Sequence, residues 1–427
     1  MIFAYRVLTA ILYPFLILLI YCRKILKKED PVRFKEKFLI SHFNIRKKNK
    51  NKLIWFHAAS IGEFKSIIPI INQLNTSHKN FQFLITTTTL SSGNLANIIL
   101  KKFNNVEHRF FPMDIEFLID NFMYLWKPDR IFLVDSEIWP NLILNAKKYN
   151  IPIALINARL TSRTFKKWMI FQNTAKKIFG IFNLCMCSNI ETQDNLKKLG
   201  ANNIFFKGNI KLIDNNDLID KKDPNEDILL NKRLWLAVST HREEEKFCLE
   251  THTKLKEKFR NIILIIAPRH TERVNEIKSL FEKSKMKVQI LNKNERISEN
   301  VEIVIINFFG ALRNYLKNAK SVFIGKSIIK RLKDDGGQNP IEAAKLGCKI
   351  YHGPYVYNFK EIYEFLDKEN ISFKVENFEQ LSENLSLDLE NFQKESFQIP
   401  MSIKNLEQKT LTDTMKLINN FLKYDGN

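Results

Sequence analysis

Ionisable side chains follow short apolar runs at several points in the first half of the sequence. Glu63 ends a segment rich in small residues, Asp135 and Glu137 follow the run 130–134, and Lys211 closes the half. A positioned carboxylate can take a proton from an attacking hydroxyl group, and a nearby cation can offset the charge of an anionic substrate. Each of these residues alone could be a solvated charge at a strand end. Together they indicate a site that binds negative groups and moves a proton.

Glu63 has two possible roles. The segment His57-Ala-Ala-Ser-Ile-Gly-Glu63 contains small residues and a glycine, which permit a tight turn into a helix with Glu63 in its first turn. A carboxylate at this position complements the helix dipole, which contributes less than about 1 kcal/mol. It could also serve as a catalytic base, and the pattern leaves both roles open.

The second half carries loops suited to phosphate. They place glycine, serine or threonine, and the cation Arg269, where helices are expected to begin, so they can neutralise a phosphate without a metal ion. The segments are Ser239–His241, Pro268–His270, Phe309–Ala311 and Gly336–Glu342. A nucleotide phosphate is the expected ligand. Glu342 follows Pro340 at the expected first turn of a helix, where it could bind ribose hydroxyls or only complement the helix dipole.

Several other kinds of site lack their motifs. The sequence has no Walker lysine motif, no GxGxxG after a predicted strand and no spaced DxD pair, and Asp334 and Asp335 are adjacent. Kinase, dinucleotide-binding and metal-dependent transferase functions are therefore disfavoured, and we expect no metal and no cofactor. The five cysteines form no CxxC pair, which favours a reducing compartment. Cys185 and Cys187 lie in an apolar run that is typical of a core.

The elements that position these residues alternate between short apolar strands and amphipathic helices. Over 427 residues this pattern predicts an α/β protein with two doubly wound lobes, whose ligands gather beyond the carboxyl ends of the strands. Strands are predicted at 53–56, 81–87, 130–134, 153–156 and 183–187, then at 234–238, 262–267, 301–307, 321–325 and 349–351. Helices are predicted, for example, at 64–74, 115–125 and 141–149. The polar segment 214–231 is predicted to link a first domain, residues 53–213, to a second domain, residues 232–427.

The amino terminus differs from the rest of the chain. Residues 2–22 are almost all apolar, about the length that crosses a bilayer, and Arg23, Lys24, Lys27 and Lys28 follow. The positive-inside rule predicts a retained single-pass anchor, residues 1–25, with the catalytic domains in the cytoplasm. Residues 26–52 form a basic segment that either binds anionic membrane lipid or is only a solvated charge run. The formal net charge of +21 also suits nucleic acid, but the anchor disfavours that partner.

In sequence order, a series of segments resembles the 3-deoxy-D-manno-octulosonic acid (Kdo) transferases, which attach Kdo from CMP-Kdo to the lipid A precursor of Gram-negative bacteria. The segments are Trp55–Glu63, Thr86–Thr89, Ser136–Leu142, Asn157–Leu160, Gly208–Lys211, Ser239–His241, Pro268–His270, Gly336–Pro340 and Gly353–Pro354. The resemblance implies the GT-B fold, with two Rossmann-like lobes, and metal-independent inversion at the anomeric carbon. It also implies an inner-membrane glycosyltransferase of lipopolysaccharide biosynthesis that acts on the precursor lipid IVA.

The resemblance further implies roles for individual residues. Glu63 is similar to the family's general base, which takes the proton from the acceptor's primary hydroxyl. Lys211 and Asp135 are similar to its transition-state stabilisers, with Asp135 in place of a glutamate. CMP binding is implied for Pro268, Arg269, Phe309, Gly310, Ala311, Asn339, Pro340, Ile341 and Glu342. Ala311, Lys326 and Gln338 depart from the family, which commonly has a carboxylate, a glycine and a histidine at these positions.

Two other functions fit the same residues. One is a GT-B transferase that uses a UDP-sugar on a lipid acceptor. The other is a catalytically silent membrane scaffold whose basic face binds anionic lipid. Kdo transfer is the preferred prediction because the segments run in the family's order from the anchor onward.

Overall fold

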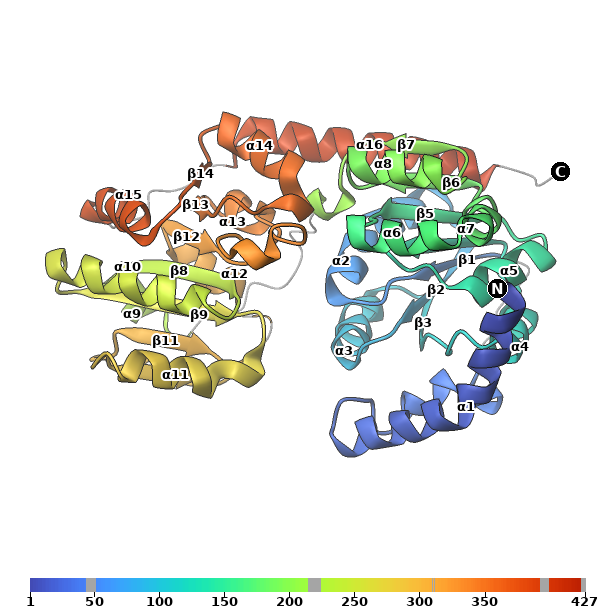
Figure 1. Ribbon diagram of the computed structural model, residues 1–427, viewed down its shortest axis with the longest axis horizontal. Helices are drawn as coiled ribbons and strands as arrows, with labels where there is room; N and C mark the ends of the chain where they lie inside the picture. The colour runs from blue at the N-terminus through green and yellow to red at the C-terminus, as the bar shows by residue number, and fades with distance from the viewer. Residues whose placement is uncertain (44–50, 214–223, 309, 311, 392–398, 424–427) are drawn as a thin grey trace. The chain divides into compact units, whose positions relative to one another are not determined.

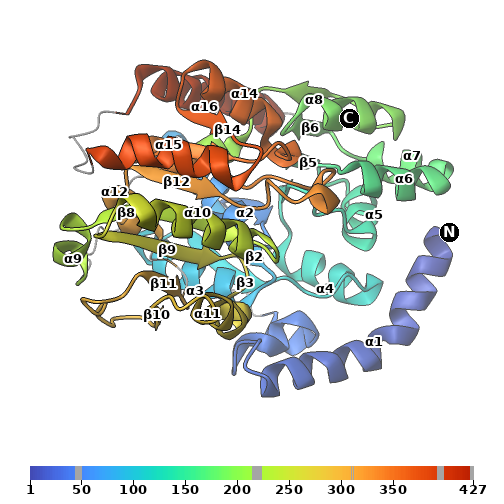
Figure 2. The ribbon, with the colours of Figure 1, turned by 60° about the vertical axis from the view of Figure 1, so that its left-hand side comes forward.

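The computed structural model of the protein describes residues 1–43, 51–213, 224–308, 310, 312–391 and 399–423. The chain divides into two units, which are labelled by element in Figures 1 and 2. Unit 1 comprises Met1–Asn216 and Glu407–Asn427, and unit 2 comprises Asp217–Leu406. Each unit contains one parallel sheet.

The sheet of unit 1 has the strand order β3-β2-β1-β4-β5-β6-β7, and every neighbouring pair is parallel. The strands are β1 (Lys52–His57), β2 (Phe81–Thr87), β3 (Val106–Phe110), β4 (Arg130–Val134), β5 (Ile153–Ala158), β6 (Leu184–Cys187) and β7 (Ile204–Phe206). The order reverses between β1 and β4, which places their carboxyl ends side by side, with His57 paired to Leu133. Ligands of doubly wound sheets bind at this kind of reversal.

Helices cover both faces of this sheet. They are α2 (Ile61–Ser77), α3 (Leu90–Ile99), α4 (Glu116–Trp126), α5 (Pro140–Lys148), α6 (Ser162–Ile170), α7 (Gln172–Phe179) and α8 (Ile190–Lys198). Side chains alternate across β1, so Trp55 lies in one core with α4, α5, α7 and α8, while Phe56 lies in the other with α2 and α3. Cys185 and Cys187 are buried in β6 as predicted, and burial raises the pKa of the Cys187 thiol to about 12.

The sheet of unit 2 has the order β10-β11-β9-β8-β12-β13-β14, again with parallel pairs. The strands are β8 (Arg233–Thr240), β9 (Ile262–Pro268), β10 (Val288–Leu291), β11 (Ile303–Ile306), β12 (Ser321–Ile324), β13 (Lys349–His352) and β14 (Ser372–Lys374). The helices are α9 (Glu226–Leu230), α10 (Glu244–Lys258), α11 (Val274–Glu282), α12 (Leu312–Asn318), α13 (Ile341–Lys345), α14 (Lys360–Lys368) and α15 (Phe378–Glu390). The prediction of two doubly wound lobes is confirmed.

The strand prediction missed the edges of both sheets. β3 and β7 lie at the two edges of the first sheet, and β10 and β14 at the two edges of the second. β3 reads Val-Glu-His-Arg-Phe and β7 has only three residues, so neither shows the long apolar run of a central strand. Edge strands are often short and charged, which weakens their sequence signal.

The predicted second domain is wrong at its carboxyl end. Helix α16 (Met401–Leu422) brings Ile418 and Phe421 into a core of unit 1, and the Arg130 guanidinium donates hydrogen bonds to the carbonyls of Phe421 and Leu422. Residues 407–427 therefore belong to unit 1 rather than to the second lobe. In the predicted linker, residues 214–223 lie outside the described part, and α9 belongs to unit 2 with Leu229 buried.

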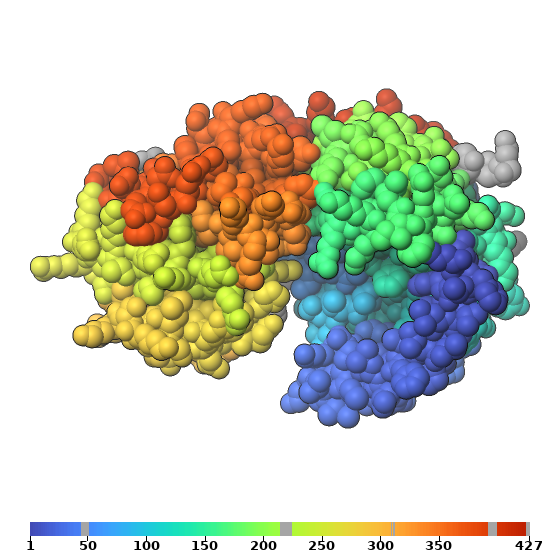
Figure 3. Space-filling view, in the orientation of Figure 1, coloured from blue at the N-terminus to red at the C-terminus, as the bar shows by residue number. Residues whose placement is uncertain are grey.

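The amino-terminal helix α1 (Ile2–Ile25) is long and apolar enough to cross a membrane, by length and composition alone. It lies at the surface of unit 1, where it is the dark blue helix of Figure 3. In the basic segment that follows, Phe34, Phe38 and Phe43 are buried in a core of unit 1, so their rings are not available to lipid. Residues 44–50, which include Arg46, Lys47, Lys48 and Lys50 of the basic segment, lie outside the described residues.

Glu243 carries backbone strain that can be tested. It precedes α10 with φ of +85°, and its exposed side chain contacts Arg331 at 3.0 Å. A left-handed conformation costs a residue with a Cβ about 1–2 kcal/mol, whereas glycine adopts it freely. We expect Glu243→Gly to raise the free energy of unfolding by about 1 kcal/mol in urea denaturation, because an exposed ion pair contributes little.

The matched control lies within α10, the helix that Glu243 precedes. Glu250→Gly, at an ordinary helical position of α10, should lower the free energy of unfolding by about 1 kcal/mol. A Glu243→Gly protein no more stable than the parent would contradict the strained conformation.

Candidate active site

Glu63 is held at the start of α2 by a local network. Ser60 caps the helix, its hydroxyl donates to Glu63 Oε1 at 2.7 Å, and the Ala59 N–H donates to Glu63 Oε2 at 2.8 Å. The Glu63 N–H donates to the Ser60 hydroxyl in return, at 3.4 Å, so the two residues cap the helix reciprocally, as in a capping box in which the N–H of Ala59 replaces that of Ser60. A Cβ built on Gly62 meets no atom within 4 Å, which leaves the helix start open beside the carboxylate.

Asp135 and Lys211 form an ion pair in the same unit. Asp135 directly follows β4 and has a left-handed φ of +63°, and its carboxylate is buried. Lys211 lies in the short helix η4 (Ile210–Leu212), and its ammonium group contacts Asp135 Oδ2. Asn209 Oδ1 accepts the Lys211 N–H at 2.9 Å, and Asn157 Oδ1 accepts the N–H of Ile210 at 2.9 Å. The side chains of Asn157 in β5 and of Asn209, the N-cap residue of η4, thus fix the position of the lysine.

The three predicted catalytic residues share one electrostatic environment. Glu63 is only 9% exposed, and burial is the main reason why its pKa is raised above the usual range of a glutamate. The charges of Glu137 and Asp135 raise this pKa further, while the Ser60 hydrogen bond and the charge of Lys211 lower it. A carboxylate with a raised pKa binds a proton more readily, which suits a general base.

A histidine and a second glutamate adjoin this group; Glu137 was counted among the charged strand-end residues in the sequence analysis, but His57 was given no role there. His57 ends β1 fully buried, with Nε2 at 3.1 Å from Glu137 Oε2 and Nδ1 at 2.9 Å from the hydroxyl of Thr86. Trp139 Nε1 donates to the same Glu137 oxygen at 2.8 Å. The available signal was positional, because His57 and Glu137 follow the adjacent strands β1 and β4.

In unit 2, the predicted CMP-binding residues lie at the carboxyl ends of its strands. Pro268 ends β9, the exposed Arg269 donates its N–H to the carbonyl of Thr240 at 3.1 Å, and Gly310 has φ of +95°. Phe309 and Ala311 lie outside the described residues.

The other predicted CMP-binding residues lie around the start of α13. Asn339 Oδ1 accepts the N–H of Ile341 at 3.1 Å, Pro340 is the N-cap residue, and Glu342 occupies the first turn as predicted. These residues follow β12, which pairs with β8, and β8 also pairs with β9. They and Arg269 therefore lie at the same end of this sheet, beyond the carboxyl ends of its strands.

Sequence reasoning missed Glu244, which organises this end of the sheet. Its fully buried carboxylate accepts backbone N–H groups of His241 (2.9 Å), Lys326 (2.7 Å) and Ser327 (2.9 Å), and burial raises its pKa. A Cβ on Gly325 would lie 2.7 Å from this carboxylate. Lys326, one of the departures from the family pattern, has φ of +58°, a conformation that glycine adopts without strain.

His241 is a neutral side chain at the same end of the sheet. Burial lowers its pKa to about 4, and Nδ1 lies 3.1 Å from the carbonyl of Ser239. Because a carbonyl only accepts hydrogen bonds, Nδ1 carries the proton and Nε2 is left as an acceptor.

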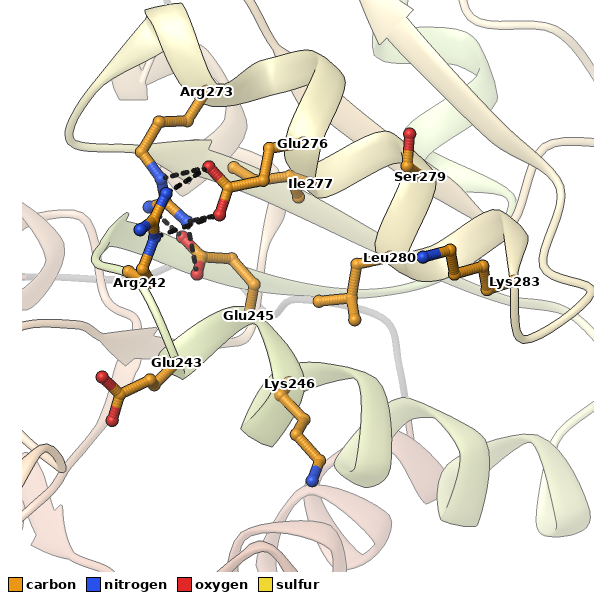
Figure 4. A pocket seen from close by; sticks show the side chains of 10 residues that line it. All are labelled: Arg242, Glu243, Glu245, Lys246, Arg273, Glu276, Ile277, Ser279, Leu280 and Lys283. Carbon is orange, nitrogen blue, oxygen red and sulfur yellow. Dashed lines mark hydrogen bonds and ion pairs between the residues drawn. The ribbon is translucent and has the colours of Figure 1, made fainter.

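A surface pocket between α10 and α11 does not coincide with these residues. Figure 4 shows its arginines engaged by glutamates: Arg242 pairs with Glu276 at 2.9 Å, and Arg273 pairs with Glu245 at 2.9 Å. None of the predicted catalytic or CMP-binding residues lines it. In the described part of the chain, no three His, Cys, Asp or Glu side chains are grouped as a metal site would require.

Two lobes that each contain a parallel sheet of this topology are typical of the GT-B class of glycosyltransferase fold, and comparisons with known proteins agree. A glycosyltransferase from Rickettsia africae has the same fold at a TM-score of 0.54, with 12% identity over 88% of this chain and 100% of that one. The 3-deoxy-D-manno-octulosonic-acid transferase family profile matches residues 32–213.

Curated relatives specify the family. The chain is 30% identical to a probable mitochondrial 3-deoxy-D-manno-octulosonic acid transferase of Arabidopsis thaliana, over 86% of this chain and 84% of that protein. It is 29% identical to the 3-deoxy-D-manno-octulosonic acid transferase of Haemophilus influenzae, over 73% of each chain. The chain belongs to the 3-deoxy-D-manno-octulosonic acid transferase family and is thus a glycosyltransferase.

The Asp135–Lys211 pair predicts a distinctive pattern of stability. Lys211→Met leaves the buried Asp135 carboxylate without its cation, which should cost about 3 kcal/mol of unfolding free energy. Adding Asp135→Asn removes the uncompensated charge and should recover most of that loss in a double-mutant cycle.

An exposed pair provides the control. Lys197 and Asp194 lie 3.7 Å apart with both side chains 59% exposed, so Lys197→Met should change stability by less than about 0.5 kcal/mol. Equal losses for Lys197→Met and Lys211→Met would contradict the assignment of a buried pair at Lys211.

Proposed function

We propose that this protein transfers Kdo from CMP-Kdo to the lipid A precursor lipid IVA, with inversion at the anomeric carbon and without a metal ion. The observation that carries the proposal is the group in unit 1, in which a buried glutamate with a raised pKa adjoins a buried carboxylate–ammonium pair. Membership of the family supports Kdo as the transferred sugar.

The chemistry follows from these side chains. Glu63 takes the proton of the acceptor hydroxyl as the oxygen of that hydroxyl forms a bond to the anomeric carbon. At the same time the bond from that carbon to the phosphate of CMP breaks. Attack opposite the departing CMP inverts the configuration. Each Glu63 oxygen accepts one local hydrogen bond, and an ionised carboxylate oxygen has a further lone pair for the proton.

Lys211 and Asp135 stabilise the charges that the donor carries and develops during transfer. Kdo carries its own carboxylate, and the departing phosphate gains negative charge in the transition state, so a fixed ammonium group stabilises both. Asp135 keeps Lys211 in place and stabilises positive charge on the anomeric carbon as the bond to CMP breaks. Because Asp135 is one methylene shorter than the family's glutamate, its backbone at φ +63° helps to set its reach.

We assign nucleotide binding to unit 2. Arg269 and the backbone at Gly310 are proposed to bind the phosphate of CMP, and Glu342 to bind its ribose hydroxyls, together with Pro268, Asn339, Pro340 and Ile341. Phe309 and Ala311 complete the predicted set. No resident cofactor is proposed.

The acceptor is a membrane lipid, so we propose that the protein is attached to the cytoplasmic face of the inner membrane through α1. Anionic lipid is the proposed partner of the exposed Lys27 and Lys28. Nucleic acid is not a proposed partner.

The transfer itself is tested with purified protein, CMP-Kdo and the acylated disaccharide precursor. We expect release of CMP and a lipid lengthened by Kdo, unchanged in excess EDTA, and no product when a UDP-sugar replaces CMP-Kdo. A strict requirement for a divalent ion, or transfer from the UDP-sugar alone, would refute the proposal.

Glu63→Gln separates catalysis from helix capping in the same assay. Glutamine keeps the size of the side chain but cannot take a proton, so kcat should fall about 10²–10⁴-fold. Glu191 provides the control because it also lies in the first turn of a helix of unit 1, and Glu191→Gln should leave kcat unchanged. Comparable activity of both variants would remove Glu63 from the mechanism.

The pH dependence of the reaction should report the pKa of Glu63. The base must be ionised, so kcat/KM, which reports the free enzyme, falls as the pH drops through this pKa, and the fall lies above the usual range of a glutamate. Glu137→Gln removes the charge that raises this pKa most, so the acidic limb should move to lower pH. Lys211→Met should move it the opposite way. Movement of both variants in the same direction would contradict the assignment.

A further inference from the structure

The first half of α1 is attached to unit 1 by its polar side chains. The Tyr5 hydroxyl donates to Asp114 Oδ2 at 2.9 Å, and Arg6 Nη1 lies 2.8 Å from Glu116 Oε1. Asp114 is 7% exposed and also accepts the N–H of Asn141 at 3.0 Å, so unit 1 fixes its position. These contacts involve the first two turns of the helix, where its amino-terminal end meets the domain.

The middle and the second half of α1 are attached to the same unit. The Tyr13 hydroxyl donates to the carbonyl of Phe38 at 2.8 Å, and the Tyr13 ring packs edge-on against Phe117 with centroids 5.1 Å apart. Ile20 is buried, and the Tyr21 ring packs against the buried Phe34 at 5.2 Å. The helix therefore follows the surface of unit 1 along its whole length.

The opposite face of α1 is apolar and exposed. Phe3, Leu8, Ile11, Phe15, Leu18 and Leu19 are each more than half exposed. An apolar row of this length on a folded domain marks a surface that a partner covers. At the end of the row, the exposed Ile25 and Leu26 precede the exposed cations Lys27 and Lys28. Apolar side chains beside cations match the acyl chains and anionic headgroups of a membrane surface.

The helix is bent in its middle. Figure 2 shows α1 turning part way along its length, and Pro14 lies inside the helix. Proline removes a backbone hydrogen bond and its ring collides with the preceding turn, which kinks a helix. The bend lets both halves of α1 keep their contacts with unit 1.

A membrane-spanning orientation conflicts with these contacts. If α1 crossed the bilayer, Tyr5 and Arg6 would lie a bilayer's thickness of roughly 30 Å from the unit that carries Asp114 and Glu116. Keeping the contacts would instead draw the charged surface of unit 1 into hydrocarbon, where polar and ionised groups are costly.

We propose that α1 lies in the plane of the membrane interface, with its exposed apolar face on the acyl chains of an anionic bilayer and unit 1 on the cytoplasmic side. This replaces the single-pass anchor predicted from the sequence. The inference rests on the proposed membrane attachment, but it does not depend on the transfer reaction.

The orientation has a consequence for the acceptor. Asp114 binds Tyr5 of α1 and also accepts N–H groups of Asn141 and Leu142 at the start of α5. The loop that precedes α5 carries Asp135. A single carboxylate thus joins the membrane-facing helix to the loop of the candidate active site, which holds this site close to the surface from which a lipid acceptor is drawn.

The test measures the depth of spin labels on the full chain. Cys22 is replaced by serine, since the other cysteines are buried, and single labels are placed at Phe3, Ile11 and Leu19. The protein is bound to vesicles of phosphatidylethanolamine and phosphatidylglycerol, and oxygen and nickel collision rates give the depth. We expect all three labels at one shallow depth, about 5–10 Å below the headgroups. A label at the exposed Lys198 of unit 1 should remain in water.

A spanning helix gives a different result. Successive labels would then differ in depth by about 12 Å, because they are eight residues apart and the helix rises about 1.5 Å per residue. That gradient would overturn the proposal, as would water-exposed labels on bound protein or spin–spin broadening from a second copy of the chain. Failure of the protein to float with the vesicles would instead refute the membrane attachment itself.

A charge reversal tests the contact that sets the orientation. Arg6→Glu places two like charges at the Glu116 contact and should shift the depth of the Phe3 label, while Arg6→Glu combined with Glu116→Arg should restore it. An unchanged depth in the single variant would show that this pair does not hold α1 against unit 1.

Discussion

The site of unit 1 depends on one electrostatic interaction, in which Lys211 offsets the charge of several carboxylates. Burial is the main cause of the raised pKa of Glu63, and the nearby negative charges of Glu137 and Asp135 raise it further. Lys211 compensates part of this charge through its contact with Asp135. The balance leaves Glu63 ionisable but with a raised affinity for a proton, which suits the role of base proposed for it.

The backbone around this site explains how Lys211 is held against Asp135. Asp135 follows β4 and Asn157 is the penultimate residue of the adjacent strand β5, and both have left-handed backbone conformations, with φ of +63° and +52°. Aspartate and asparagine adopt this conformation more readily than other residues with a Cβ, which suits them to these two positions. The Asn157 side chain accepts the backbone N–H of Ile210, so this residue positions the helix η4 that carries Lys211.

Buried carboxylates organise loops elsewhere in the protein by the same principle. Glu244 gathers backbone N–H groups of the loop after β12 in unit 2, and Asp114 gathers those at the start of α5 in unit 1. A buried carboxylate is stable only when donors satisfy it, so each one specifies the shape of its loop. At Asp114 one of the donors is the Tyr5 hydroxyl of α1, which connects this helix to the fold.

The sequence by itself determined the alternation of central strands and helices, the first-turn positions of Glu63 and Glu342, and the buried setting of Cys185 and Cys187, because these depend on neighbouring residues and local periodicity. Only the tertiary structure decided the rest of the site. It paired Asp135 with Lys211 across 76 positions, set His57 against Glu137, and placed Glu244 under the loop of unit 2. It also returned α16 to unit 1 and laid α1 along the surface of that unit. These arrangements depend on which strands and helices become neighbours, and local patterns do not encode the free energy of such distant contacts.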